Sequence, residues 1–292
     1  MPFTYLAHVL TIPVRVSDIA TKFIFDTGIG INLISEALAA QVGCCPDGST
    51  FTGRRMSGQA VTAPLGSLAS LEVGASQMRN VPVGIFDLQA MAGLGDVEGF
   101  LSLSFFRTTP VTVDYAAGQL VLEDEASLAR RAAAGTSVCV HVGRDGCSTD
   151  VMLGIDLPNG RPISVEVDTG SDTLILNERL AGDAGIDLRG PGIRQVKASD
   201  ETGHGFVRYF TALRGDIKVS GTPSISVTDP PVMFQKIIYD GLVGDAFLRN
   251  FTTTYDLASS RMIFAAPSLR RAGRSRDAGL DKQGRGAGER DT

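Results

Sequence analysis

The sequence is poor in the residues that build metal centres and histidine-dependent catalytic sites. It contains only three histidines, which are not closely spaced: His8, His141 and His204. This spacing gives little support to a histidine metal site or to a Ser-His-Asp triad. We therefore expect a protein that uses no metal and no other cofactor.

Cysteine is also scarce, and its spacing excludes two further classes. The four cysteines are Cys44, Cys45, Cys139 and Cys147. Adjacent cysteines rarely bridge each other, and the pattern resembles neither a secreted disulfide framework nor a structural zinc site. We expect four free thiols, which is typical of a cytoplasmic protein.

Long hydrophobic runs are missing near the start of the chain. The apolar stretch "FTYLAHVLTIPV" is too short to span a bilayer. It also lacks a positively charged leader and a cleavage site of small residues, which a signal peptide would have. The sequence therefore predicts a cytoplasmic location and no association with a membrane.

Neither sign of charge dominates the sequence. There are 27 basic and 32 acidic residues, and the last 26 residues hold seven of the basic and four of the acidic ones. The rest of the chain is mildly acidic, which argues against nucleic acid as a partner. Residues 267–292 are rich in Gly and charge and have few apolar residues, so we expect a disordered basic tail.

One short motif, Asp-Thr-Gly, occurs twice after an apolar stretch. It appears in "IFDTGIG" (24–30) and in "EVDTGSD" (166–172), so the two aspartates are 142 residues apart. The same offset relates Gly99 to Gly241 and "GFLSLSFFR" to "GLVGDAFLR". A register kept over such a length indicates an internal duplication. We predict an N-terminal lobe at 1–125, a linker at 126–139 and a C-terminal lobe at 140–266.

The local patterns within each lobe are mostly those of β-strands. Short β-branched segments such as "KFIFD", "AVTAPL", "SLASLEV" and "PISVEVD" are separated by Gly, Pro, Asn or Asp, and each is expected to form a strand. One helix is expected after each Asp-Thr-Gly loop, with N-caps at Ser35 and Asn177 and ends near Gly43 and Gly185. The segment "DEASLARRAAAG" suits a short helix or a linker. The predicted fold class is mainly β, with two similar lobes.

Two such loops can together carry out acid–base chemistry. Homologous lobes usually pack about a pseudo-twofold axis, which would bring Asp26 and Asp168 face to face. Two neighbouring carboxylates share one proton, because both cannot ionise easily. The ionised one can then activate a water while the protonated one polarises a carbonyl. This chemistry predicts hydrolysis of an amide without metal or covalent intermediate.

Each half also resembles a lobe of the aspartic proteases of the retropepsin/pepsin clan. The resemblance rests on "FDTGIGINLIS", "VDTGSDTLILN" and the two closing segments "EGFLSLSFFRTTPVTVDYAAGQLVL" and "DGLVGDAFLRNFTTTYDLASSRMIFA". It implies two retropepsin-like β-barrel lobes fused in one chain. It also implies an aspartic-type endopeptidase that binds a peptide or protein substrate in the cleft between the lobes. Because the duplication supplies both lobes, we expect a monomer.

The resemblance assigns roles to residues of the two loops. Asp26 and Asp168 correspond to the catalytic pair, and Ser171 to the small polar residue that donates to a catalytic carboxylate. The remaining loop residues correspond to the cross-lobe threonines and the glycines of the loop backbone: Thr27, Gly28, Thr169 and Gly170. Two positions depart from the family pattern, because Ile29 stands opposite Ser171 and Ser102 stands where a glycine is expected.

Two hairpins between the loops and the closing segments are candidate flaps, at 51–64 and 199–212. Gly-rich tips suit a mobile lid, although an ordinary exposed hairpin would look the same. The first lacks the tyrosine of a pepsin-type flap, and Tyr209 in the second is expected to be a packing residue. The candidate substrate-binding residues are Ile31, Leu33, Met56, Ser57, Gly58, Gly203, His204 and Gly205.

Two other functions remain open on the sequence alone. One is a catalytically inert peptide-binding protein on the same fold, which Ile29 and Ser102 would favour. The other is a scaffold domain in which the Asp-Thr-Gly segments are only turns. A short separation of the two carboxylates would argue against the scaffold.

Overall fold

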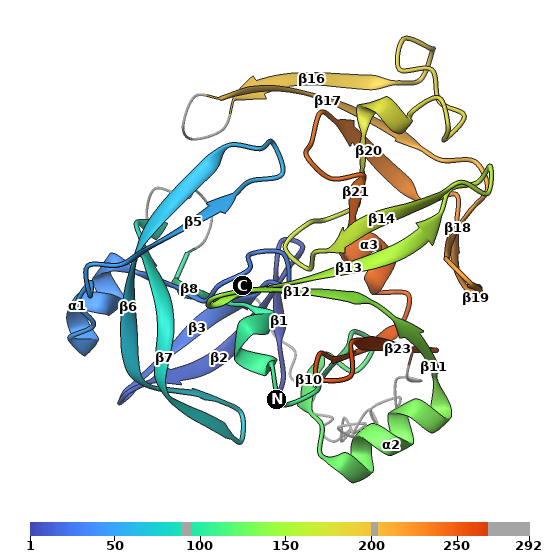
Figure 1. Cartoon of the computed structure of the whole chain (residues 1–292). Helices are drawn as coiled ribbons and strands as arrows, with labels where there is room; N and C mark the ends of the chain where they lie inside the picture. The colour runs from blue at the N-terminus through green and yellow to red at the C-terminus, as the bar shows by residue number, and fades with distance from the viewer. Residues whose placement is uncertain (89–94, 200–203, 268–292) are drawn as a thin grey trace, which may run out of the picture.

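The structure is a computed structural model that describes residues 1–88, 95–199 and 204–267 (Figure 1). The described chain is dominated by β-strands, as predicted from the short β-branched segments. The strands form three sheets, of which two each belong to one half of the sequence and the third is shared. The expected basic tail at 267–292 falls almost wholly outside the described residues.

The first sheet is built from the first half of the chain, in blue to cyan in Figure 1. Its strand order is β1-β2-β3-β8-β4-β7-β6-β5. In chain order the strands are β1 (Thr4–Leu6), β2 (Val9–Val16), β3 (Ile19–Phe25), β4 (Leu33–Ser35), β5 (Thr50–Arg54), β6 (Ala60–Val73), β7 (Ser76–Phe86) and β8 (Val97–Leu101). The sheet carries the first Asp-Thr-Gly loop between β3 and β4.

The second sheet is built from the second half of the chain. Its order is β16-β17-β20-β15-β21-β14-β13-β18-β19, with β12 paired to β13. The strands are β12 (His141–Asp145), β13 (Ser148–Asp156), β14 (Pro162–Val167), β15 (Leu174–Asn177), β16 (Arg194–Ser199), β17 (Gly205–Ala212), β18 (Asp216–Val219), β19 (Thr222–Thr228), β20 (Pro231–Gln235) and β21 (Gly241–Val243). It carries the second Asp-Thr-Gly loop between β14 and β15.

The third sheet joins the two halves. Its order is β10-β9-β22-β23-β11. The strands are β9 (Val111–Asp114), β10 (Gln119–Leu122), β11 (Thr136–Cys139), β22 (Thr252–Asp256) and β23 (Arg261–Ala265). The helix α2 (Glu125–Ala134) lies beside this sheet at the bottom of Figure 1, and its capping box at Asp124 explains where it begins. The predicted linker at 126–139 therefore consists largely of α2 and β11.

The two large sheets have matching connections around the Asp-Thr-Gly loops. β3 is parallel to β8 and β14 is parallel to β21. Likewise β4 is parallel to β7 and β15 is parallel to β20. Below the loops, buried side chains of both halves form one continuous core. The loops thus emerge from rigid, buried strands, which is a suitable support for a precise site.

The helix prediction is confirmed for the first half, and for the second half only the N-cap Asn177 and a single short helical turn are confirmed. Helix α1 (Glu36–Val42) begins at the N-cap Ser35 and ends at Gly43, which has φ +67°. After Asn177 there is instead a 3₁₀-helix, η3 (Glu178–Leu180), followed by turns. Gly182 lies in this segment, and a glycine costs about 1 kcal/mol in a helix interior. The helix therefore ends before it completes two turns.

Three smaller expectations can also be compared with the structure. All four cysteines are free, as expected. The segments "AVTAPL" and "SLASLEV", which read as two strands, form the single strand β6. No helix in the described parts of the chain combines the length and the apolar character needed to cross a membrane.

Candidate active site

The two aspartates occupy matching positions at the ends of buried strands. Asp26 follows β3, and its N–H donates to Leu101 O at 3.0 Å. Asp168 follows β14, and its N–H donates to Val243 O at the same distance. Each loop then turns back on its aspartate. The N–H of Gly28 donates to Asp26 Oδ1 and the N–H of Gly170 donates to Asp168 Oδ1, both at 2.9 Å. The backbone therefore holds both carboxyl groups in the same way.

The threonines tie the two loops together through four hydrogen bonds. Thr27 Oγ1 donates to Val167 O at 2.6 Å, and Thr169 Oγ1 donates to Phe25 O at 2.9 Å. Thr27 Oγ1 also accepts the backbone N–H of Thr169 at 3.0 Å, and Thr169 Oγ1 accepts that of Thr27 at 3.1 Å. Both threonine side chains are fully buried. This reciprocal set fixes the two loops relative to each other.

The fixed loops bring the two carboxyl groups into direct contact. A Cβ atom on Gly28 would lie 2.5 Å from Asp168 Oδ1, and one on Gly170 would lie 2.5 Å from Asp26 Oδ2. Only glycine leaves room for the opposing carboxylate at these two positions. The scaffold alternative predicted two distant aspartates, and the structure contradicts it.

The electrostatics of the pair are asymmetric. Burial raises the pKa of Asp26 well above its usual range, and the negative charge of Asp168 and a hydrogen bond with its carboxyl raise this pKa further. Backbone hydrogen bonds from Gly28 and Ile29 oppose the shift and do not cancel it. Ser171 Oγ donates to Asp168 Oδ2 at 2.5 Å, which favours the ionised form of that carboxyl. Both the burial of Asp26 and the hydrogen bond from Ser171 to Asp168 favour a shared proton on Asp26.

The two departures from the expected pattern have different structural consequences. Ile29 packs its side chain against the apolar cluster around Phe100, so it offers only its backbone to Asp26. Ser102 is fully buried and accepts the N–H of Ser104, while its own N–H donates to Asn32 Oδ1 at 3.0 Å. At Gly244 a Cβ would lie 2.5 Å from Ser171 O. The serine is thus accommodated by hydrogen bonds and causes no backbone strain.

An apolar pocket of about 400 Å³ adjoins the carboxyl pair on the side of Asp26. Ile31 and Leu33, both predicted to bind substrate, line this pocket. The other apolar side chains in its wall are Ile29, Phe51, Val61, Ala63, Phe86 and Phe100, and Arg54 and Arg55 also line it. A pocket of this composition can bury an apolar side chain of a ligand.

A second pocket, of about 310 Å³, adjoins Asp168. Three of the predicted residues, Met56, Ser57 and His204, line it. Most of the remaining wall is polar or charged and consists of Arg54, Arg55, Glu166, Ser171, Arg208 and Gln235, with Phe206, Tyr239 and Leu242. The two pockets meet at the carboxyl pair and differ in chemistry.

The hairpin of β5 and β6 reaches from the first sheet to the second half of the chain. At its tip, Met56 O accepts the N–H of Ile238 at 2.8 Å. Gly58 has φ +87° and lies against Ile238, and it lines neither pocket. The second candidate flap is the hairpin of β16 and β17. Its residue Gly205 also lines neither pocket, and Gly203 lies outside the described residues.

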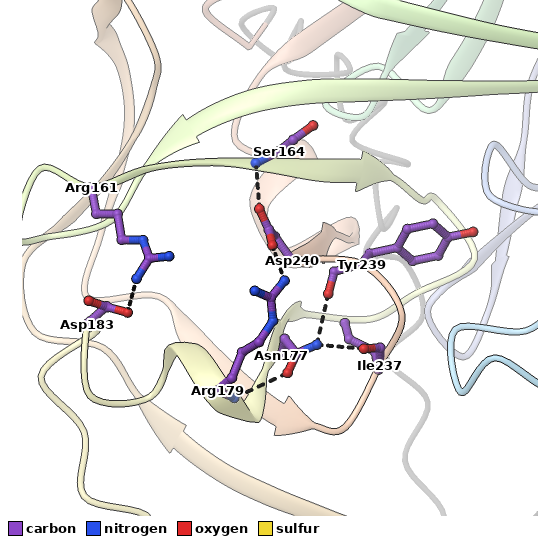
Figure 2. A network of polar contacts seen from close by, with 8 residues as sticks. All are labelled: Arg161, Ser164, Asn177, Arg179, Asp183, Ile237, Tyr239 and Asp240. Carbon is purple, nitrogen blue, oxygen red and sulfur yellow. Dashed lines mark hydrogen bonds and ion pairs between the residues drawn. The ribbon is translucent and has the colours of Figure 1, made fainter.

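The loop that receives the hairpin tip is held by a polar network (Figure 2). Asn177 Nδ2 donates to Ile237 O at 2.5 Å and to Tyr239 O at 3.1 Å. Asp240 accepts the N–H of Ser164 and forms an ion pair with Arg179. In Figure 2 the Tyr239 ring points away from this network. Tyr239 also lines the pocket beside Asp168.

Residues 12–105 match the family model of aspartyl proteases. The matched region includes Asp26, Thr27, Gly28 and the strands that support them. It ends before the second Asp-Thr-Gly loop. A comparison with curated proteins gives no significant match.

The sequence prediction missed several residues of the second pocket. Glu166 is the most consequential, because it is an acidic residue with only 6% of its surface exposed. The sequence did contain a signal for it: the 142-residue offset aligns Glu166 with Ile24, so an acid stands where the other half has an apolar residue. Arg208 and Gln235 had no such signal, because only the pairing of β17 with β20 brings them together.

Proposed function

We propose that the protein is an aspartic endopeptidase that hydrolyses peptide bonds with a water activated by Asp26 and Asp168. The observation that carries this proposal is the contact between two carboxyl groups from two Asp-Thr-Gly loops, each beside the other loop's glycine. The family match of residues 12–105 supports the same assignment. The inert peptide-binding alternative lacks comparable support, because both carboxyl groups are retained.

The proposed architecture is a pair of homologous retropepsin-like lobes about a pseudo-twofold axis. The matching parallel pairings of the two large sheets support it. A further argument comes from the shared sheet, where Thr112 of β9 pairs with Thr254 of β22, its equivalent at an offset of 142 residues. An antiparallel pair of equivalent residues is what a twofold axis between two copies produces. A single chain with both lobes requires no partner subunit, so we propose a monomer.

The proposed reaction uses the asymmetry of the pair. Asp168, ionised and hydrogen-bonded by Ser171, takes a proton from a water as its oxygen attacks the peptide carbonyl carbon. Asp26 gives its proton to the carbonyl oxygen, which yields a neutral tetrahedral intermediate. Asp168 then returns its proton to the amide nitrogen as the C–N bond breaks, and Asp26 recovers a proton from the intermediate. The pair ends in its starting protonation state, with no cofactor consumed.

The surroundings of the pair suit a peptide. Two pockets flank the carboxyl groups, so they can take side chains on either side of a bond between them. The hairpin of β5 and β6 contributes Phe51, Arg54 and Met56 to their walls. We propose that it acts as a lid over the bound peptide, which would exclude water from the reaction. The hairpin of β16 and β17 contributes His204 and Phe206 from the other side.

The test is hydrolysis of a diverse peptide library by the full chain. We expect cleavage by the wild-type protein and none by Asp26→Asn or Asp168→Asn, with circular dichroism showing that both variants fold. The two variants also control for contaminating protease, because they pass through the same purification. Binding of peptides without cleavage would favour the inert alternative, and equal turnover by either variant would contradict a shared pair.

A further inference from the structure

The floor of the pocket beside Asp168 carries a buried acid that the proposed reaction does not use. Glu166 lies on β14, two residues before Asp168, and pairs with Met152 of β13 and Leu242 of β21. Only 6% of its surface is exposed, and it lines the pocket. A buried carboxyl at this place needs a functional or structural explanation, because its desolvation is costly.

No group in the described parts of the chain compensates Glu166. Among the described residues, its carboxyl forms no hydrogen bond and no ion pair. Its electrostatic neighbours are all acids, namely Asp168, Asp150 and Asp26. Burial, and to a lesser extent the charges of these acids, raises the pKa of Glu166 to about 9. The deep end of this pocket therefore carries an acid, and no cation of the described residues forms an ion pair with it.

Two of the three arginines that line the same pocket, Arg208 and Arg54, contact other groups. Arg208 Nε donates to Gln235 Oε1 at 2.9 Å, and its guanidinium lies 4.2 Å from the centre of the Phe206 ring. The acid that acts on Arg208 is Asp172, not Glu166. Arg54 donates to Gly58 O within the hairpin. These cations line the pocket but leave its acidic floor without a partner.

The first half shows which residue stands at the position of Glu166. It is Ile24, which lies in a buried apolar cluster with Leu88, Val97 and Phe100, and of these four Phe100 lines the pocket beside Asp26. The cluster around Glu166 is otherwise similarly apolar and consists of Ile175, Met233, Ile237 and Leu242, packed by Met56, Phe210 and Tyr239. The stem of a long side chain could pack on such a surface while its charged end reaches the acid.

We propose that the pocket beside Asp168 selects a basic side chain, lysine or arginine, of the peptide, and that Glu166 determines this selectivity. This inference rests on the proposed function, because it assumes that a peptide lies across the carboxyl pair. The other pocket, with its apolar wall, takes an apolar side chain. The predicted substrate thus has a basic residue on one side of the cleaved bond and an apolar residue on the other.

Binding of a basic side chain should release a proton. In the empty pocket the Glu166 carboxyl is neutral near pH 7, because its pKa is raised to about 9. An entering ammonium or guanidinium group stabilises the carboxylate, so the carboxyl proton leaves to solvent. The charged or titratable groups that face Glu166 or share its pocket are Asp26, Asp150, Asp168, Tyr239, Arg54, Arg55, Arg208 and His204. Glu166 lines the pocket, is buried, and is not one of the two carboxyl groups of the pair.

The experiment measures binding, so that it does not depend on turnover. The probes are peptides in which a hydroxyethylene group replaces the cleaved amide, with phenylalanine on one side of it. Lysine, norleucine or glutamate stands on the other side, and both orders are synthesised. Calorimetry of the full chain in two buffers of different ionisation enthalpy gives the affinity and the number of protons released.

We expect the wild-type protein to bind the lysine peptide about 10- to 100-fold more tightly than the norleucine peptide, the range expected of a hydrogen bond to a charged group. Glu166→Gln should reduce this ratio to about threefold or less and abolish the proton release. Glu166→Ile, which copies Ile24, should favour norleucine. Glu72→Gln, an exposed substitution on β6, is the control and should change nothing.

Four results would overturn the inference. A lysine preference that survives in Glu166→Gln would exclude Glu166 as its cause. Tightest binding of the glutamate peptide would show that the arginines, not the acid, determine the selectivity. If no probe binds to the wild-type protein, the proposed peptide cleft fails and this inference fails with it, whereas binding without the predicted preference refutes the inference alone. Thermal unfolding of each variant shows whether it is folded.

Discussion

The threonines between the loops offer a direct test of what holds the site together. Thr27→Val keeps the shape of the side chain and removes its hydroxyl. Val167 O and the N–H of Thr169 then lose their hydrogen bonds to it inside the protein. A buried polar group without a partner costs about 1–3 kcal/mol. With two such groups, we expect the free energy of unfolding to fall by about 2–6 kcal/mol.

Urea denaturation of the full chain measures this change as a shift in midpoint at constant slope. Thr27→Ser keeps the hydroxyl and loses one methyl group, so we expect a cost of only about 1 kcal/mol. Thr254→Val is the matched control, because its buried hydroxyl has a single hydrogen bond, with Thr112 Oγ1 at 2.7 Å. If Thr27→Val destabilises the protein no more than this control does, the four reciprocal bonds do not join the loops as argued.

Three further substitutions test the carboxyl pair and its surroundings. Gly170→Ala would place a methyl group 2.5 Å from Asp26 Oδ2. The carboxyl must then move by about 1 Å, and kcat/KM for a peptide substrate should fall by about 100-fold. Gly182→Ala meets open space and should leave kcat/KM unchanged, so equal values for both variants would refute the contact. Ser171→Ala should move the acidic limb of the pH profile of kcat/KM upward by as much as about one unit, and an unmoved limb would contradict its hydrogen bond. Glu166→Gln should reveal a pH-dependent penalty in the wild-type protein, because burial raises the pKa of Glu166 to about 9 in the folded state. Folding then retains a proton that the unfolded chain loses above about pH 4.5, so wild-type stability should fall relative to the variant by up to about 1.4 kcal/mol per pH unit between pH 5 and 9. Urea denaturation at pH 5, 7 and 8.5 measures this difference, and a constant difference would contradict the raised pKa.

The parts of the site that sequence alone predicts are those with a local cause. A loop of Asp, Thr and Gly after a buried strand indicates its own backbone hydrogen bonds, and the repeat of the motif indicates that two such loops meet. The N-cap at Ser35 and the left-handed Gly43 likewise predict α1 from their immediate neighbours. These elements need no knowledge of distant contacts.

The parts that sequence misses depend on distant contacts or on small differences between the halves. Arg208 and Gln235 meet only through strand pairing, across 27 residues of chain. In the second half Asn177 is indeed an N-cap, but it begins only the short η3, and its side chain also donates to Ile237 O and Tyr239 O. The residue therefore holds the pocket loop as well as capping η3, and a cap signal alone cannot distinguish these two roles.

Ser102 shows how the two halves can differ and still support equivalent loops. In the second half Gly244 lies so close to Ser171 O that no side chain fits. In the first half the chain admits a serine, because Asn32 stands nearby and accepts its N–H. The equivalent of Asn32 is Leu174, which cannot accept a hydrogen bond, so the serine and the asparagine belong together. The same reasoning applies to Ile24 and Glu166. If the halves are copies of one unit, as we propose, the carboxyl pair requires that the strands that support it stay alike in both halves. Selection of an asymmetric peptide requires that the two pockets differ.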